Sequence, residues 1–158
     1  GAARGGSALW LFHRGNTGPA DAGAAILELE LEALRRWLDG RGSLPVIGDV
    51  VRFDLGSIAD QRLGFTDACA ESGRVFYLAS AEAAADAIAD GRILGSQLGV
   101  ITEDGVRAVS LCSAEGLALK AEGLAFDPAR PGHAWIVLDP DDPEQPATLL
   151  EVELTGPW

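Results

Sequence analysis

The sequence has little of the chemistry on which disulfide-rich, metal-binding and membrane proteins depend. Its 158 residues include two cysteines, two histidines, one lysine and no methionine. No apolar run approaches the ~18 to 20 residues of a membrane helix, and no basic stretch followed by an apolar segment marks a secretion signal. We therefore expect a soluble, cytoplasmic protein. Because the chain begins at Gly1 and lacks Met, we also expect that a preceding segment is missing.

Basic residues are scarce as well, with 12 Lys and Arg against 24 Asp and Glu, for a net charge of −12. Such a field repels nucleic acid and anionic membranes, whose binding requires clustered Lys and Arg. The charge balance favours cations, and cationic or neutral ligands.

The few cysteines and histidines are spread along the chain. Cys69 and Cys112 fall in different predicted strands and form no Cys-x-x-Cys pair. This spacing favours two buried free thiols over a disulfide, which it leaves possible. His13 and His133 lie too far apart in the sequence to suggest a zinc site.

An internal repeat organises what is present. Three segments each open with a turn glycine, continue as an apolar run with an aromatic residue, and end at a polar group: 6–13, 73–80 and 132–139. Short apolar runs bounded by glycine are typical of buried strands. Their spacing exceeds the ~40 to 50 residues of propeller blades, and we assign the excess to loop insertions. Trp10, Phe76 and Trp135 would be equivalent anchors of successive sheets.

Further strands are predicted around these copies, at 24–31, 46–55, 64–70, 96–102, 106–111, 122–126 and 148–154. Asp104-Gly105 is a strong hairpin signal. Counted in fours, the strands predict an all-β fold: a β-propeller with about three four-stranded blades. The first blade spans about 7–56 and lacks its inner strand, the second spans 64–112, and the third spans 121–155 and lacks its outer strand. Residues 1–158 would then be the C-terminal part of a larger, six-bladed ring. The partner would be the remainder of the propeller, from another segment or chain, or a second copy.

Two helical stretches interrupt the strands as loop insertions. One covers 31–38, with three leucines on one stripe and a stop at Asp39-Gly40. The other is the Ala-rich stretch 81–90, with Gly91 as its stop. In this second helix Glu82, Asp86 and Asp90 would share one face, either as a solvated acidic surface or as a site for a cation or guanidinium.

Several of these segments resemble bacterial phytase-like β-propeller proteins of mostly unassigned function. The resemblance rests on 64–68, 81–82, 90–91, 95–100, 121–125 and 149–154. It covers nearly the whole chain and about the second half of the family's usual length. Members are often labelled phytase-like or esterase-like. The resemblance thus implies a propeller and supplies no substrate.

Carboxylates on the predicted inner strands are the leading site candidates. Asp67 lies inside an apolar run, where it must be paired, bind a cation or face water; an Asx-type turn is the alternative. Glu122 opens the corresponding strand of the last blade. The pentapeptide Ala-Glu-Gly-Leu-Ala occurs at 114–118 and again at 121–125, so Glu115 is a near copy, and the resemblance favours Glu122.

Residues next to turns complete the candidate set. His13 could act as a general base and Asn16 as a neutral cation ligand, although a structural role for the histidine is the alternative. The acidic loop 139–144 is rich in oxygen ligands but departs from the EF-hand pattern, which favours a rigid acidic turn.

Two functions remain open on this sequence. One is a hydrolase of a phosphoester, ester or lactone, with Ca²⁺ or another divalent cation held by Asp67, Glu82, Glu122 and Asn16, and with Asp67, Glu122 and His13 as catalytic residues. The other is a non-catalytic propeller that binds a ligand or a protein. Convergence of the three carboxylates around a cation would favour the hydrolase, and separate bonds to backbone amides would favour the binding module.

Overall fold

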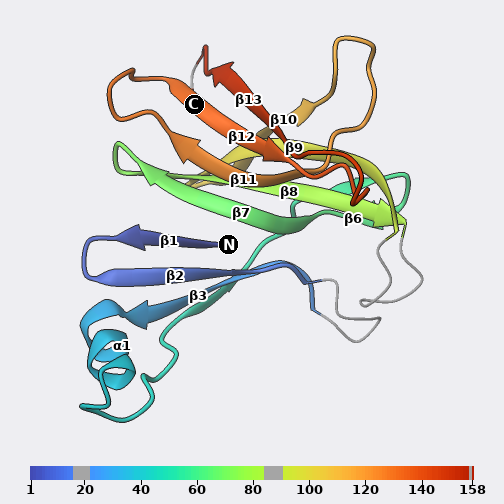
Figure 1. Ribbon diagram of the computed structural model, residues 1–158. Coiled ribbons are helices and arrows are strands. Elements are labelled where there is room, and N and C mark those ends of the chain that lie inside the picture. Colours follow the sequence, from blue (N-terminus) through green and yellow to red (C-terminus); the bar gives the residue numbers. More distant parts are fainter. Residues whose placement is uncertain (16–21, 84–90, 157) are drawn as a thin grey trace.

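The protein is all-β (Figure 1). The computed structural model describes residues 1–15, 22–83, 91–156 and 158. Its elements are β1 (Ala2–Gly5), β2 (Ala8–His13), β3 (Ala25–Glu30), α1 (Leu31–Leu38), β4 (Val50–Arg52), β5 (Ser57–Ile58), β6 (Gln61–Arg62), β7 (Gly64–Glu71), β8 (Arg74–Ala83), β9 (Arg92–Thr102), β10 (Gly105–Leu111), β11 (Ala121–Phe126), β12 (His133–Leu138) and β13 (Thr148–Glu153). No helix among these residues is long and apolar enough to cross a membrane.

The strands form three main antiparallel sheets, and in each sheet neighbouring strands are consecutive in the sequence. Sheet 1 contains β1 to β4, sheet 2 contains β7 to β10, and sheet 3 contains β11 to β13. Strands β5 and β6 make a small separate hairpin. Because consecutive strands pair, short turns suffice, and left-handed turn residues such as Ser72 (φ 51°) and Gly73 (φ 76°) reverse the chain between β7 and β8.

The three sheets pack face to face, with sheet 2 in the middle. Alternate residues of β8 point to opposite faces. Tyr77 and Ala79 join the core shared with sheet 1, together with Phe12 and Phe65. Leu78, on the other face, joins the core shared with sheet 3. Both faces of the central strands β8 and β9 are therefore largely buried, and these two strands read as nearly continuous apolar runs.

Tyr77 is fully buried, and its place in the core depends on a glycine. A Cβ atom at Gly99, the residue paired with Tyr77 on β9, would lie 2.4 Å from the tyrosine ring. The ring also packs edge-on against Phe65, with centroids 5.2 Å apart. Its hydroxyl accepts a hydrogen bond from Gln97 Nε2 (3.2 Å), and burial raises the pKa of Tyr77 to about 12. Any larger residue at position 99 would displace this ring.

The first strands of the three sheets, β1, β7 and β11, make the main contacts between sheets. All three run in the same direction, and the second strands run back the opposite way (Figure 1). Trp10, Phe76 and Trp135 lie on the second strands β2, β8 and β12 of three different sheets. The equivalence inferred from the repeat therefore holds at the level of strand position.

The strand predictions are largely confirmed, with three corrections. Sheet 1 has four strands, because Ala2–Gly5 pairs with β2; the prediction of a missing strand there is wrong. Residues 81–83 extend β8 and are not helical, since they pair with β9; residues 84–90 of that predicted helix lie outside the described residues. The edge strand β4 covers only Val50–Arg52 of the predicted 46–55.

The helix α1 forms as predicted. Glu30 caps its first turn, where the carboxylate accepts hydrogen bonds from Glu32 N (2.9 Å) and Ala33 N (2.7 Å). None of its residues is buried. Both cysteines are free thiols, as favoured, but only Cys69 is partly buried. Cys112 is exposed, because it lies next to the irregular segment that leads to β11.

Candidate functional site at the strand ends

One end of the sheets gathers the charged side chains. The second strands β2, β8 and β12 end there, and the first strands β7 and β11 begin there, on the right in Figure 1. Arg14 directly follows β2, Glu82 lies near the end of β8, Asp139 directly follows β12, and Lys120 directly precedes β11. Charged side chains from distant parts of the sequence can therefore meet at this end.

The first strands β7 and β11 share a local distortion there. The pairing of β7 with β8 shifts between Phe65 and Asp67, and the pairing of β11 with β12 shifts between Ala121 and Gly123. Thr66 and Glu122 are thus the extra residues of two β-bulges. A bulge redirects the side chain of its extra residue away from the regular pleat. Thr66 Oγ1 donates a hydrogen bond to the carbonyl oxygen of Ala121 (2.7 Å), which links the two strands.

Two ion pairs act electrostatically on Glu122. Arg14, just after β2, pairs with Glu82 near the end of β8, with Nη2 and Oε1 2.5 Å apart. The Glu82 side chain is 7% exposed, so this carboxylate is neutralised in a largely dry position. Lys120, just before β11, is also buried; it pairs with Asp141 and lies 3.9 Å from Asp139.

Glu122 itself is half-buried, and among the described residues no hydrogen bond to its carboxylate is found. Burial is the largest influence on it and raises its pKa above the ordinary value of 4.5. Arg14 and Lys120 oppose this shift, while Glu82 and Asp139 add to it. We call these five residues the charged cluster: Arg14, Glu82, Lys120, Glu122 and Asp139.

Asp67 accepts a backbone hydrogen bond from the neighbouring sheet. It lies on β7 beside the bulge, half-buried, and its Oδ2 accepts a hydrogen bond from the backbone N–H of Leu124 on β11 (2.8 Å). The Gly1 backbone is close by, since a Cβ atom there would lie 2.7 Å from Asp67 Oδ1. The carboxylate therefore joins first strands of neighbouring sheets.

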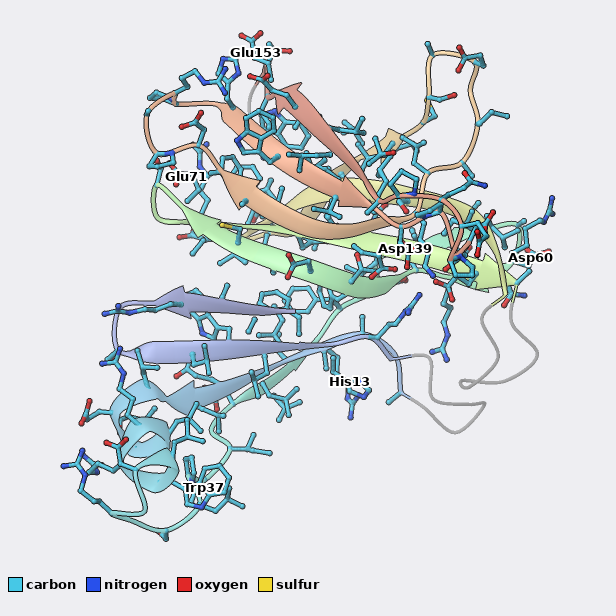
Figure 2. All side chains as sticks on the ribbon, in the orientation of Figure 1. His13, Trp37, Asp60, Glu71, Asp139 and Glu153 are labelled. Atoms are coloured by element: carbon cyan, nitrogen blue, oxygen red, sulfur yellow. The ribbon has the colours of Figure 1, made fainter. Side chains whose placement is uncertain are left out.

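Of the remaining predicted site residues, the structure describes only His13, and it does not bring this side chain to the charged cluster. His13 is exposed and pairs with Ala25 on β3. Figure 2 shows its side chain pointing away from β7 and Asp139. Asn16, Asp86 and Asp90 lie outside the described residues. Within the described ranges, no group of three or more His, Cys, Asp or Glu side chains is placed to hold a metal ion.

The acidic loop after β12 forms a self-bonded turn, in line with the favoured interpretation. Asp139 Oδ1 accepts a hydrogen bond from Asp141 N (2.9 Å), and Asp142 Oδ1 accepts one from Glu144 N (3.0 Å). Gln145 Nε2 donates to Asp142 Oδ2 (2.7 Å). The loop uses its oxygens on its own backbone and on Lys120.

Sequence reasoning selected Glu82 and Glu122 but missed the cations that surround them. Arg14 directly follows His13, and its side chain turns toward sheet 2 where that of His13 turns away. Lys120 is the lone lysine of the chain, and it directly precedes the strand that carries Glu122. The sequence signal that points to both cations is a basic residue directly next to a predicted strand.

The comparison with family models identifies a relationship but no activity. A model with the description "Family of unknown function (DUF6929)" matches residues 1–154. This is nearly the whole chain, which therefore belongs to that family. No significant match is found among curated proteins or solved structures. None of these comparisons links the chain to phytase-like or esterase-like proteins.

Proposed function

We propose that this member of the DUF6929 family forms consecutive blades of a β-propeller and binds a small ligand, without catalysis, through the charged cluster. The single observation that carries the proposal is the environment of the Glu122 carboxylate. This side chain is a half-buried carboxylate on a bulge, lacks a hydrogen bond from the described residues, and interacts electrostatically with the two cations Arg14 and Lys120.

Three features support a propeller. The sheets are antiparallel with strands in chain order, they pack face to face, and their first strands are parallel and closest together. In propellers, ligands bind where the inner strands converge around the axis. The outward face of sheet 3 carries exposed Val137 and Leu149, and the remaining blades would cover such faces.

The cluster suits a ligand that is cationic or neutral and polar. Its three carboxylates outnumber its two cations, and the whole chain carries a net charge of −12. A bound ammonium or hydroxyl group would give the Glu122 carboxylate a donor that the described residues do not supply, and would offset the cost of its burial. A polyanion would meet repulsion instead.

A hydrolase is the second candidate, and one observation favours it. A carboxyl group with a raised pKa can serve as general acid or base toward a phosphoester, ester or lactone, and the pKa of Glu122 is raised. If a divalent cation takes part, Glu82 and Glu122 would supply oxygen ligands. The ion pair of Glu82 with Arg14 and the bond from Leu124 N to Asp67 support the binding module more strongly.

A thermal-melt screen tests the proposal, because a ligand that binds only the native state raises the midpoint. The panel contains amines, neutral sugars, and Ca²⁺, Mg²⁺ and Mn²⁺ against EDTA. We expect an amine or sugar to raise the midpoint of the wild type and of Glu115→Gln, and not that of Glu122→Gln. Glu115 is the matched control, since it occupies the same pentapeptide.

The screen also separates the two candidates. A shift with a divalent cation that disappears in Glu122→Gln would favour the metal-assisted hydrolase over the binding module. A ligand that shifts the wild type and Glu122→Gln equally would contradict a role for the charged cluster in either function.

A further inference from the structure

The stretch from the end of α1 to β4 exposes an unusual amount of apolar surface. Eleven large apolar side chains are exposed among the described residues, and seven of them lie within this one stretch. We call these seven residues the apolar edge: Trp37, Leu38, Leu44, Val46, Ile47, Val50 and Val51. Figure 2 shows Trp37 at the margin of the molecule, beyond β3.

The apolar edge has the area of one half of a stable interface. Its side chains are 41% to 86% exposed. At roughly 100 Å² each, they present on the order of 700 Å², above the ~300 to 600 Å² patch of a typical monomer and near the ~800 Å² per partner of a standard interface. Apolar exposure of this extent, concentrated in one stretch of the chain, indicates an interaction site.

The electrostatics of this stretch differ from those of the rest of the chain. Residues 31–52 contain four basic side chains (Arg35, Arg36, Arg41 and Arg52) and three acidic ones (Glu32, Asp39 and Asp49), a net charge of +1 in a chain of net charge −12. Two copies that approached through other surfaces would repel each other. At this nearly neutral stretch the local repulsion is weak.

The backbone of β4 is also available for pairing with another strand. Strand β4 is the outer strand of sheet 1 and pairs with β3 on one side only. All three of its residues are exposed. Outer strands are usually protected from pairing by Lys, Pro or an inward charge, whereas two of the three residues of β4 are valine. An unprotected strand edge beside an apolar patch favours the addition of another strand.

We infer that the apolar edge is the interface of a symmetric dimer, in which β4 of one copy pairs antiparallel with β4 of a second copy. A twofold axis between the strands brings the same residues together from both copies, so the contact closes on itself. Valine side chains then meet across the strands, a favourable pairing for β-branched residues. The two four-stranded sheets become one continuous sheet.

The dimer leaves the charged cluster free and stands independently of the proposed ligand. The apolar edge lies on α1, on the segment that follows it and on β4, the outer strand of sheet 1. The cluster lies at the ends of β2 and β8 and at the start of β11. Failure of either proposal would not affect the other.

Sedimentation equilibrium of the whole chain over a concentration series tests the dimer. We expect the wild type to approach twice its monomer mass of 16.4 kDa. Val50→Lys and Val46→Lys should halve this to the monomer mass. Val46 is 86% exposed and lies outside any strand, so its replacement spares the fold. Val109→Lys is the matched control: Val109 is 48% exposed on β10, the outer strand of sheet 2, against 50% for Val50.

Hydrogen exchange gives a second readout on the same samples. Amides of Val50–Arg52 should exchange more slowly in the dimer than in the Val46→Lys monomer. The inference is overturned by a wild type that stays monomeric at every concentration. It is equally overturned by a dimer that survives both substitutions, or by assemblies that grow without limit as concentration rises.

Discussion

The chain contains the same pentapeptide twice, and the two copies have different structures. Ala-Glu-Gly-Leu-Ala at 121–125 lies in β11, with Leu124 in the core between sheets 2 and 3. At 114–118 it forms a turn whose five residues are exposed. Identical local propensities therefore produce a strand in one place and a turn in the other. Packing against β7 and β12 decides the outcome.

The two glutamates of these copies have opposite electrostatics. Burial raises the pKa of Glu122. A hydrogen bond from Ser113 Oγ lowers the pKa of Glu115, helped by the Glu115 backbone. Burial of the Glu122 carboxylate thus carries a desolvation cost, whereas the Glu115 carboxylate is hydrogen-bonded and exposed to solvent. Of the two, the partly buried carboxylate with the raised pKa is the better indication of a binding site.

The leucines of the pentapeptides give the largest expected difference. Leu124 is 7% exposed and Leu117 is 64% exposed. Leu124→Ala should lower the free energy of unfolding by about 3 kcal/mol, because it removes core contacts and leaves a cavity. Leu117→Ala should change it by less than about 0.5 kcal/mol. Urea denaturation of both variants measures the difference, and equal losses would mean that the two copies are equally packed.

The next largest effect is expected for the hydrogen bond from Leu124 N to Asp67, which links the copy of the pentapeptide in β11 to β7. Asp67→Ala removes the acceptor for Leu124 N and leaves that half-buried amide without its partner. We expect the free energy of unfolding to fall by about 2 kcal/mol. Asp54→Ala is the control, since Asp54 bonds Gly56 N in an exposed turn. Comparable denaturation midpoints for the two variants would remove the strand-joining role of Asp67.

The smallest expected effect concerns the pH dependence of stability, which should have opposite signs for Glu122 and Glu115. The folded pKa of Glu122 is raised, so its ionisation opposes folding. The stability of the wild type relative to Glu122→Gln should fall as the pH rises from 4.5 through the folded pKa. The folded pKa of Glu115 is lowered, so the stability of the wild type relative to Glu115→Gln should be present above 4.5 and lost below it. Melts across pH 3 to 8, about the range of carboxyl and imidazole titration, would contradict the account if both differences had the same slope.

Much of the fold could be predicted from the sequence because its strands are apolar runs between turn glycines. Such runs specify a buried strand without knowledge of the partner. The short strand Ala2–Gly5 was missed, since Ala, Arg and Gly carry little strand propensity and pairing with β2 supplies the stability. Residues 81–83 were predicted as helix because alanine favours helices, and pairing with β9 overrides that preference.

The site was less predictable than the fold. Glu122 was selected because it stands at the start of a repeat strand. Arg14 and Lys120 come close to Glu122 because strands that are distant in the sequence have their ends at the same side of the sheets. The sequence does not show directly which strand ends lie together. His13 is a candidate because an imidazole can act as a general base, but strand alternation directs the His13 side chain away from sheet 2.

The most direct test of the account is a carbon-13 NMR titration of the glutamate side-chain carboxyls, assigned with the two Gln variants. The account predicts a midpoint for Glu122 above 4.5 and one for Glu115 below it. A common midpoint, or the reverse order, would contradict the claim that the fold places one copy of the pentapeptide in a buried, charged site and the other in solvent.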